Sequence, residues 1–280
     1  MPLQPLTIDS HCHVHFNAYK DDIDEVIKRS LAENVFMVTV GTQTNTSQKA
    51  VEVAEKYEGV WAAIGLHPCH THEQRLDPEE IGGKEAIHTR SEEFDPGFYR
   101  HLAQSKKVVA VGEIGLDYHH FEDSDDVVAL KEKQKKEFIQ ALEFANSVSL
   151  PVMIHCWDAY DDLLEILKNH PVKKLGVVHS FVGGHKTAKK FIELGYKIGL
   201  NGIITYTESY DRLIHELNLE DILLETDAPY LAPPPYRGER NEPRHVVEVA
   251  KKIAAVKGCN LEEIKKITTD NTKKLLGLNF

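Results

Sequence analysis

The chain has 280 residues, of which 41% are hydrophobic and 28% charged, and its formal net charge is −11. This composition is typical of a globular protein with a large apolar core, and it excludes an intrinsically disordered chain. The acidic balance excludes a protein that coats nucleic acid with its whole surface, because that mode requires many Lys and Arg side chains against phosphates. A local basic groove or a metal centre that binds phosphate is still compatible with it.

Nothing in the sequence predicts export or a membrane anchor. The residues before the first strand-like run lack the basic start of a signal peptide, and no apolar run approaches the roughly 20 residues that span a membrane. The cysteines form no C-x-x-C pair and no dense framework, so we expect no structural disulfides. We therefore expect a cytoplasmic protein that acts away from membranes, and no obligate protein partner is implied. The cysteines are Cys12, Cys69, Cys156 and Cys259.

Short runs rich in Val, Ile and Leu alternate along the chain with longer helical patterns. This alternation is typical of repeated β-loop-α units. The clearest helix is predicted over 127–148, where Phe138, Ala141 and Ala145 fall on one apolar face. The eight candidate strands cover residues 6–10, 35–40, 60–64, 108–112, 151–154, 175–178, 196–200 and 221–224.

Eight such strands could close into a barrel or form an open sheet. Ligand-type residues follow the first, third, fourth, fifth, sixth and eighth strands. Closing the sheet brings these carboxyl ends around one mouth, whereas an open sheet would scatter them along a crevice. We therefore expect an α/β fold, a (β/α)8 TIM barrel of the metal-dependent hydrolase type, as a single domain over residues 1–280.

One connection is much longer than the roughly 2–6 residues that such units need. It lies near 69–96, after the third strand, and barrel geometry places it over the mouth. It either shapes the substrate site or is a plain solvated insertion.

The opening run IDSHCHVHF contains His11 and His13 at the end of a buried-looking strand. Alternation in an extended chain points both side chains to one side, where two imidazoles can share a metal. Surface histidines produce the same spacing by chance. His15 continues the register beyond the expected strand end.

Glu113 is expected just past the fourth strand, between Gly112 and Gly115, which let backbone approach a crowded centre. A carboxylate there can bridge two cations, or it can be a buried Glu that pairs with Lys or Arg. Two further strands end in His155 and His179. One histidine that closes an apolar strand is commonly a hydrogen-bonded core residue, but two on consecutive strands indicate a shared site.

Asp227 follows the eighth strand, and Glu225 is either a buried support or a partner of a ligand. Together these residues offer four imidazoles and two carboxylates, the donor set of a dinuclear hydrolytic site. Two divalent cations, Mg²⁺, Mn²⁺ or Zn²⁺, could activate water there for phosphoryl or acyl transfer. We expect catalytic roles for Glu113 and for Asp227, which could accept the proton of the water. The predicted ligands are His11, His13, Glu113, His155, His179 and Asp227.

The chain carries the motifs DSHCH at 9–13, GLHP at 65–68, VGEIGLDY at 111–118, PVMIH at 151–155, HSF at 179–181 and ETDAPYLAPPPYRGERNEP at 225–243. These motifs cover nearly the whole chain and resemble those of the TatD family of metal-dependent deoxyribonucleases, in the amidohydrolase-like barrel superfamily. The resemblance implies that His11, His13 and Asp227 bind one metal, that His155 and His179 bind the other, and that Glu113 bridges them. It also implies a DNA phosphodiester substrate that is attacked from an end.

We expect substrate contacts from Arg237, Arg240, Trp157 and His67. The arginines are in the loop nearest Asp227, and the planar guanidinium suits phosphate oxygens. Salt bridges to neighbouring glutamates are the alternative. Trp157 stands where family members tend to have an arginine, and it either stacks on a base or packs beside the mouth.

Three functions follow from this site. The first is a phosphodiesterase that trims DNA with metal-activated water. The second is an amidohydrolase-type deacylase or esterase on a small molecule, favoured by Trp157 and the acidic charge. The third is a metal-stabilised binding protein without catalysis, against which the complete ligand set counts.

Overall fold

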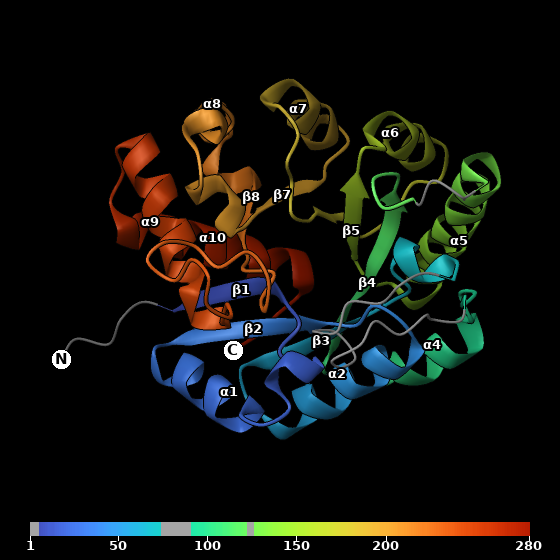
Figure 1. The fold of residues 1–280 in the computed structure, drawn as a ribbon, viewed down its shortest axis with the longest axis horizontal. Helices are drawn as coiled ribbons and strands as arrows, with labels where there is room; N and C mark the ends of the chain where they lie inside the picture. The colour runs from blue at the N-terminus through green and yellow to red at the C-terminus, as the bar shows by residue number, and fades with distance from the viewer. Residues whose placement is uncertain (1–5, 74–90, 122–125) are drawn as a thin grey trace.

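The chain folds as a ring of parallel strands with helices outside it (Figure 1). The computed structural model describes residues 6–73, 91–121 and 126–280. In these residues, eight strands form one parallel sheet in their order along the chain, which confirms the predicted (β/α)8 barrel. The strands are β1 (Thr7–Cys12), β2 (Val35–Val40), β3 (Val60–Ile64), β4 (Val108–Asp117), β5 (Val152–Trp157), β6 (Gly176–Val178), β7 (Lys197–Leu200) and β8 (Ile222–Leu224).

The ring closes where the segment after β8 meets β1. The backbone N–H of Asp227 donates to the carbonyl of His11 over 2.9 Å, and the N–H of His13 donates to the carbonyl of Ala228 over 2.7 Å. The first and the last motif of the sequence therefore lie side by side.

Three strands extend further at their carboxyl ends than their apolar runs predict. Glu113 lies inside β4 and His155 inside β5, so their expected positions at or past the strand ends were wrong. The reason is the pairing between these strands, which continues through Gly115 opposite His155 and Asp117 opposite Trp157. Backbone hydrogen bonding thus carries the strands into a polar stretch that alternation of apolar residues cannot reveal.

The helices of the described residues lie outside the ring, and the helix predicted over 127–148 is confirmed with the same bounds. They are α1 (Ile23–Ala32), α2 (Thr44–Lys56), α4 (Pro96–Leu102), α5 (Val127–Val148), α6 (Tyr160–Asn169), α7 (His185–Glu193), α8 (Asp211–Glu216), α9 (Val246–Lys257) and α10 (Leu261–Leu276). Among them, none combines the length and apolar character needed to cross a membrane.

Alternation along the strands divides the core into two layers. On β2, Met37 belongs to the cluster that packs with the helices, whereas Val38 and Val40 belong to a second cluster, which fills the inside of the barrel. The second cluster also includes Ile8, Ala63, Ala110, Met153, Val177 and Leu223.

The long insertion near 69–96 lies partly outside the described residues, since 74–90 are not described. Its two ends meet beside the barrel, where the N–H of Glu92 donates to the carbonyl of His70 over 2.9 Å. Cys69 and His70 line the cavity at the carboxyl ends of the strands, and the position of the whole insertion over the mouth stays a prediction.

Candidate metal centre

A cavity of about 570 Å³ opens at the carboxyl ends of the strands. The inward-facing positions change there from apolar to polar. On β5, β6 and β8 the inner residues Met153, Val177 and Leu223 are each followed two positions later by His155, His179 and Glu225. The floor of the cavity includes Glu113, His155, His179 and Asp227, and its wall carries the aromatic side chains Phe16, Phe121, Trp157 and Tyr230.

His11 and His13 come from the end of β1, where the pairing with β2 is irregular between Asp9 and Cys12. This irregularity turns both rings to one place, with the two Nε2 atoms 3.3 Å apart. The Nδ1 of His13 lies 2.6 Å from the carbonyl of Val40. Both rings are buried, so their positions are fixed by the strands.

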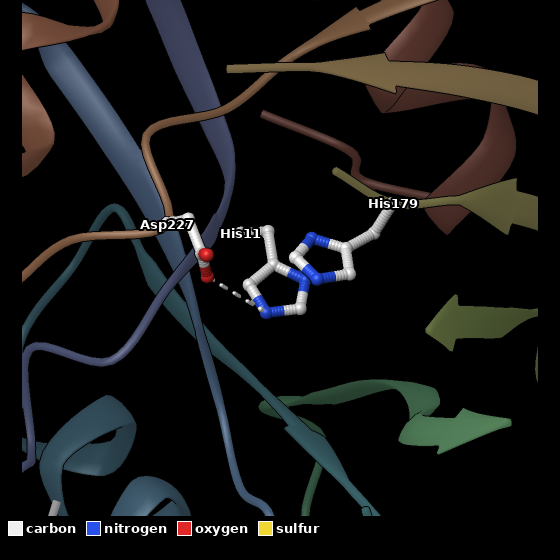
Figure 2. A group of neighbouring side chains, drawn as sticks. All are labelled: His11, His179 and Asp227. Atoms are coloured by element: carbon white, nitrogen blue, oxygen red, sulfur yellow. Dashed lines mark ion pairs between the residues drawn. The ribbon is translucent and has the colours of Figure 1, made fainter. Parts of the chain in front are cut away.

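Asp227 lies beside these rings and has a left-handed backbone conformation, with φ of 58°. Its Oδ1 is 3.3 Å from Nε2 of His13 and 3.8 Å from Nε2 of His11. Figure 2 shows its carboxylate directed at His11, whose ring stacks on His179 with 3.7 Å between the ring centroids. Burial alone would raise the pKa of the Asp227 carboxyl, but His13, His179 and His11 lower that pKa to about 2, so the group is ionised.

Glu113 lies at the centre of the group, between two pairs of histidines. Its Oε2 is 3.4 Å from Nε2 of His11 and 3.7 Å from Nε2 of His13. Its Oε1 is 3.0 Å from Nε2 of His179 and 3.1 Å from Nδ1 of His155. Oε2 therefore faces His11 and His13, whereas Oε1 faces His179 and His155 and also lies 3.4 Å from Nε2 of His67.

The electrostatics of this position favour an ionised Glu113. Burial alone would raise the pKa of its carboxyl, but His67, His179 and His11 hold that pKa well below its usual value. No lysine or arginine is paired with Glu113 among the ion pairs of the described residues. Within the described residues, the partners of Glu113 are therefore histidines rather than Lys or Arg.

Two buried carboxylates lie behind the rings of His155 and His179. The Oδ2 of Asp117 accepts a hydrogen bond from Nε2 of His155 over 2.8 Å. The Oε1 of Glu225 lies 3.3 Å from Nδ1 of His179. Gly199 leaves the space for Glu225, because a Cβ at this glycine would lie 2.4 Å from Oε2 of Glu225.

These outer contacts decide which ring nitrogens can hold a metal. A carbonyl or carboxylate only accepts, so the outer nitrogens of His13 and His155 carry the hydrogen. In a neutral ring, the inner nitrogen then directs its lone pair at the carboxylate of Glu113 or Asp227. Such an arrangement is repulsive on its own and becomes attractive with a cation between the groups. The donor set, imidazole nitrogen with carboxylate oxygen, fits a divalent cation.

The pKa values of two of these rings are raised, which is the direction expected where buried carboxylates attract positive charge. Burial disfavours protonation of His155, but Asp117 and Glu113 outweigh it and raise its pKa to about 9. Burial likewise opposes protonation of His179, and Glu113 and Glu225 raise its pKa well above its usual value. Without metal, protons supply the charge that the buried carboxylates require.

Two of the four predicted substrate contacts line the cavity. Nε2 of His67 is 3.4 Å from Oε1 of Glu113. Trp157 is 36% exposed and stacks on His119, with 4.5 Å between the ring centroids and 9° between the planes. Both could therefore touch a bound molecule.

Neither predicted arginine lines the cavity. Arg240 makes a two-pronged pair with Asp22, at 2.8 and 2.6 Å, and also donates to the carbonyl of Ala18 over 2.7 Å. Arg237 lies over the ring of Tyr206, with 3.7 Å from Cζ to the ring centroid. For Arg240, the alternative of a salt bridge is the better description, although the partner is Asp22 rather than a neighbouring glutamate.

Arg244 has the partner that the sequence suggested for this loop. Its Nε donates to Glu242 and its Nη1 to Glu33, both over 2.9 Å. Arg240 and Arg244 thus attach the loop after β8 to the residues that flank α1.

Asp117 is a site residue that the sequence reasoning missed. It lies in β4 on the same face as Glu113 and Gly115, four positions after Glu113 and two after Gly115. Continuing the alternation through VGEIGLD would have found it. Ending the strand at Gly112 hid the signal.

A family model described as TatD related DNase matches residues 8–277. The chain belongs to the TatD family. Its relatives include the uncharacterized metal-dependent hydrolase YabD of Bacillus subtilis (strain 168), 34% identical over 98% of this chain and 100% of the relative. Another is the uncharacterized metal-dependent hydrolase YcfH of Escherichia coli (strain K12), 32% identical over 97% of this chain and 96% of the relative.

A solved structure supports the same membership. The TatD homologue YJJV from Escherichia coli K12 superposes with a TM-score of 0.82, at 30% identity and with 98% of both chains covered. A hydrolase of the TatD family from Entamoeba histolytica shares the fold, with a TM-score of 0.79 at 22% identity. The resemblance seen in the motifs is confirmed, and this TatD-family chain is a metal-dependent hydrolase.

Proposed function

We propose that the chain hydrolyses DNA phosphodiester bonds at a strand end, with two divalent cations, Mg²⁺, Mn²⁺ or Zn²⁺. The observation that carries the proposal is the position of Glu113, whose two oxygens face two separate pairs of inner imidazole nitrogens. Family membership supplies the reaction class, because the matching family is described as related to DNases.

The proposed ligands divide into two sets that share Glu113. His11, His13 and Asp227 would hold one cation, and His155 with His179 would hold the other. The sharing is supported by ligand atoms within 4.8 Å of one another in the groups His11, His13, Glu113 and Glu113, His155, His179. His11 also groups with His179 and Asp227, so the two sets adjoin.

Bound cations would acidify water and stabilise negative charge on the phosphate. Asp227 accepts the proton of the attacking water, since its carboxylate is ionised and is the more exposed of the two central carboxylates, at 17% against 4% for Glu113. The oxygen of that water bonds to phosphorus, and the bond from phosphorus to the leaving oxygen breaks. Glu113 stays ionised and keeps the ligand sets together.

The cavity suits the end of a strand better than a duplex. Its volume of about 570 Å³ falls in the range of pockets that enclose one small ligand. Trp157 and Phe16 offer flat faces at its wall, and stacking of a base on an aromatic ring contributes about 1–3 kcal/mol. We propose that the terminal base stacks on Trp157 while its phosphate lies over Glu113.

Substitution of the two central carboxylates tests the proposal. We expect that Glu113→Ala and Asp227→Asn each lower cation-dependent cleavage of a short single-stranded DNA by at least about 10³-fold, with the fold intact by circular dichroism. His101→Ala, at an exposed position of α4, is the matched control and should cleave like the wild type. Undiminished DNA cleavage by both carboxylate variants would contradict the proposal.

A second candidate is an amidohydrolase-type deacylase or esterase on a small molecule. It is favoured by one observation: neither Arg237 nor Arg240 lines the cavity, so these arginines offer no contact to a phosphate there. Turnover of acyl or amide substrates by wild-type protein, without DNA cleavage at any concentration of the three cations, would decide for this candidate.

A further inference from the structure

His67 lies beside the predicted ligands, but its ring is held in a different way. It caps the short 3-10 helix η2 (Pro68–Thr71), and its Nδ1 accepts a hydrogen bond from the backbone N–H of Cys69 over 3.2 Å. A backbone amide only donates, so Nδ1 carries no hydrogen. The hydrogen of a neutral His67 ring must then be on Nε2.

The rings of His13 and His155 have the opposite arrangement. Their outer nitrogens face the carbonyl of Val40 at 2.6 Å and the carboxylate of Asp117 at 2.8 Å. Those partners accept, so the inner nitrogens keep a lone pair for a cation. His67 has a donor behind it, and its inner nitrogen therefore presents a hydrogen.

Nε2 of His67 points into the cavity on the side of His155. It lies 3.4 Å from Oε1 of Glu113, and the centroids of the His67 and His155 rings are 4.3 Å apart. The side chain of His67 keeps 14% exposure, so a bound molecule can reach it.

We propose that His67 is a neutral hydrogen-bond donor rather than a cation ligand, and that its Nε2–H stabilises the negative charge that develops on a phosphate oxygen. The inference rests on the proposed phosphodiesterase function and adds to it the protein group that meets the substrate beside the cations. His67 transfers no proton, since the proton of the water passes to Asp227. A donor fixed in advance by the backbone needs no reorganisation during the reaction.

The tautomer is measured directly by proton–nitrogen NMR on protein with ¹⁵N-labelled histidine. We expect His67 to show a protonated Nε2 and an unprotonated Nδ1, both in metal-free protein and after loading with Zn²⁺. His155 is the internal comparison, because its Nε2 hydrogen should also persist while its Nδ1 becomes a ligand. A hydrogen on Nδ1 of His67, or the loss of its Nε2 hydrogen on loading, would overturn the assignment.

Two variants test the role in catalysis. His67→Ala should lower kcat on short single-stranded DNA by about 10²–10³-fold, the usual effect of removing one charge-stabilising donor. His67→Gln should recover part of that loss, because its amide can donate a hydrogen bond. Metal content by elemental analysis should equal that of the wild type in both. Loss of a cation, or an unchanged kcat, in both variants contradicts the proposal.

Wild-type protein and His101→Ala are the reference in the same assays. If the wild type cleaves no DNA with Mg²⁺, Mn²⁺ or Zn²⁺, the proposed function fails, and the catalytic role of His67 fails with it. The NMR experiment still decides the tautomer in that case, so the two failures are distinguishable.

Discussion

Asp117 accepts hydrogen bonds on all sides in the interior of the protein. Its Oδ1 accepts from the backbone N–H groups of His119 and His120, each over 3.0 Å. Its Oδ2 accepts from Nδ1 of His120 and Nε2 of His155, each over 2.8 Å. An amide at this position would have to turn its NH₂ group toward one of these pairs of donors. Asp117 therefore fixes the orientation of His155 in a way that asparagine cannot.

We expect Asp117→Asn to weaken cation binding about 10–100-fold, as is typical when the partner behind a histidine ligand is changed. Titration against a competing chelator measures the affinity. Asp221→Asn is the matched control, because Asp221 pairs with Lys197 and does not line the cavity. Equal cation affinity in the wild type and in Asp117→Asn would contradict a role of Asp117 in cation binding.

Cation binding should also depend on pH. Burial disfavours protonated His155, but Asp117 and Glu113 outweigh it and raise its pKa to about 9. Below that pH the metal-free ring carries a proton that a cation must displace. Affinity should therefore fall as the pH decreases from about 9 to about 6, by up to about tenfold per unit for one displaced proton. Calorimetry in buffers with different heats of ionisation counts the protons that are released on binding. Equal cation affinity at about pH 9 and about pH 6 would contradict the prediction.

For single residues, the sequence predicts which residues lie at the centre of the site but not which groups they hydrogen-bond to. His155 and His179 could be predicted because they follow apolar strands. The tautomer of His67 could not, since it depends on the backbone N–H of Cys69. The position of Arg240 could not either, because Asp22 is distant in the sequence and offers a two-pronged partner only after the barrel has closed.

The element that holds Glu113 is β4, and glycines let it approach its neighbours. A Cβ on Gly115 would lie 2.0 Å from the carbonyl oxygen of His155 on β5, and Gly115 has φ of 148°. A Cβ on Gly65, just after β3, would lie 2.7 Å from the carbonyl carbon of Gly112. The close spacing of the strands, and with it the distance between Glu113 and His155, therefore requires glycine at positions 115 and 65.

Gly115→Ala should separate β4 from β5 and so disturb both Glu113 on β4 and His155 on β5. We expect destabilisation by about 1–3 kcal/mol from the strained backbone and the steric clash, with loss of bound metal. Urea unfolding and elemental analysis measure the two effects. Gly184→Ala is the control, since a Cβ there meets nothing within 4 Å. Normal metal content in Gly115→Ala would contradict the close packing described here.

The order and number of the strands were predictable because each apolar run is bounded by turns and helical segments. Their carboxyl ends were not predictable from the same pattern. Leu116 and Asp117 continue β4 because they pair with Cys156 and Trp157 of β5. The sequence of either segment alone does not predict this pairing. The part of the sheet that carries the site is therefore the part that the alternation of apolar residues describes least well.

At the scale of the whole molecule, the contacts that close the barrel also bring residues of the site together. The carboxylate of Asp9 on β1 accepts from the N–H of Thr226 over 2.9 Å and from its hydroxyl over 2.5 Å. Asp227, the next residue, donates its N–H to His11. A cation held between Asp227 and β1 would therefore also fasten the first strand to the last.

Removal of metal should destabilise the folded chain. If cation is present at about 100 times its dissociation constant, binding adds about 2.7 kcal/mol, which corresponds to roughly 5–10 °C in Tm. We expect a chelator to lower the Tm of wild-type protein by this amount and added Mn²⁺ to restore it. Glu113→Ala should respond weakly to both, because its two ligand sets have lost the group that they share. Thermal unfolding followed by circular dichroism makes the comparison.

The most direct test of the metal centre is X-ray diffraction from crystals grown with Mn²⁺, with anomalous differences measured at the manganese edge. We predict two peaks about 3.5–4 Å apart on either side of Glu113, one beside His13 and Asp227 and one beside Nδ1 of His155 and Nε2 of His179. A single peak, or manganese located away from Glu113, would contradict the account.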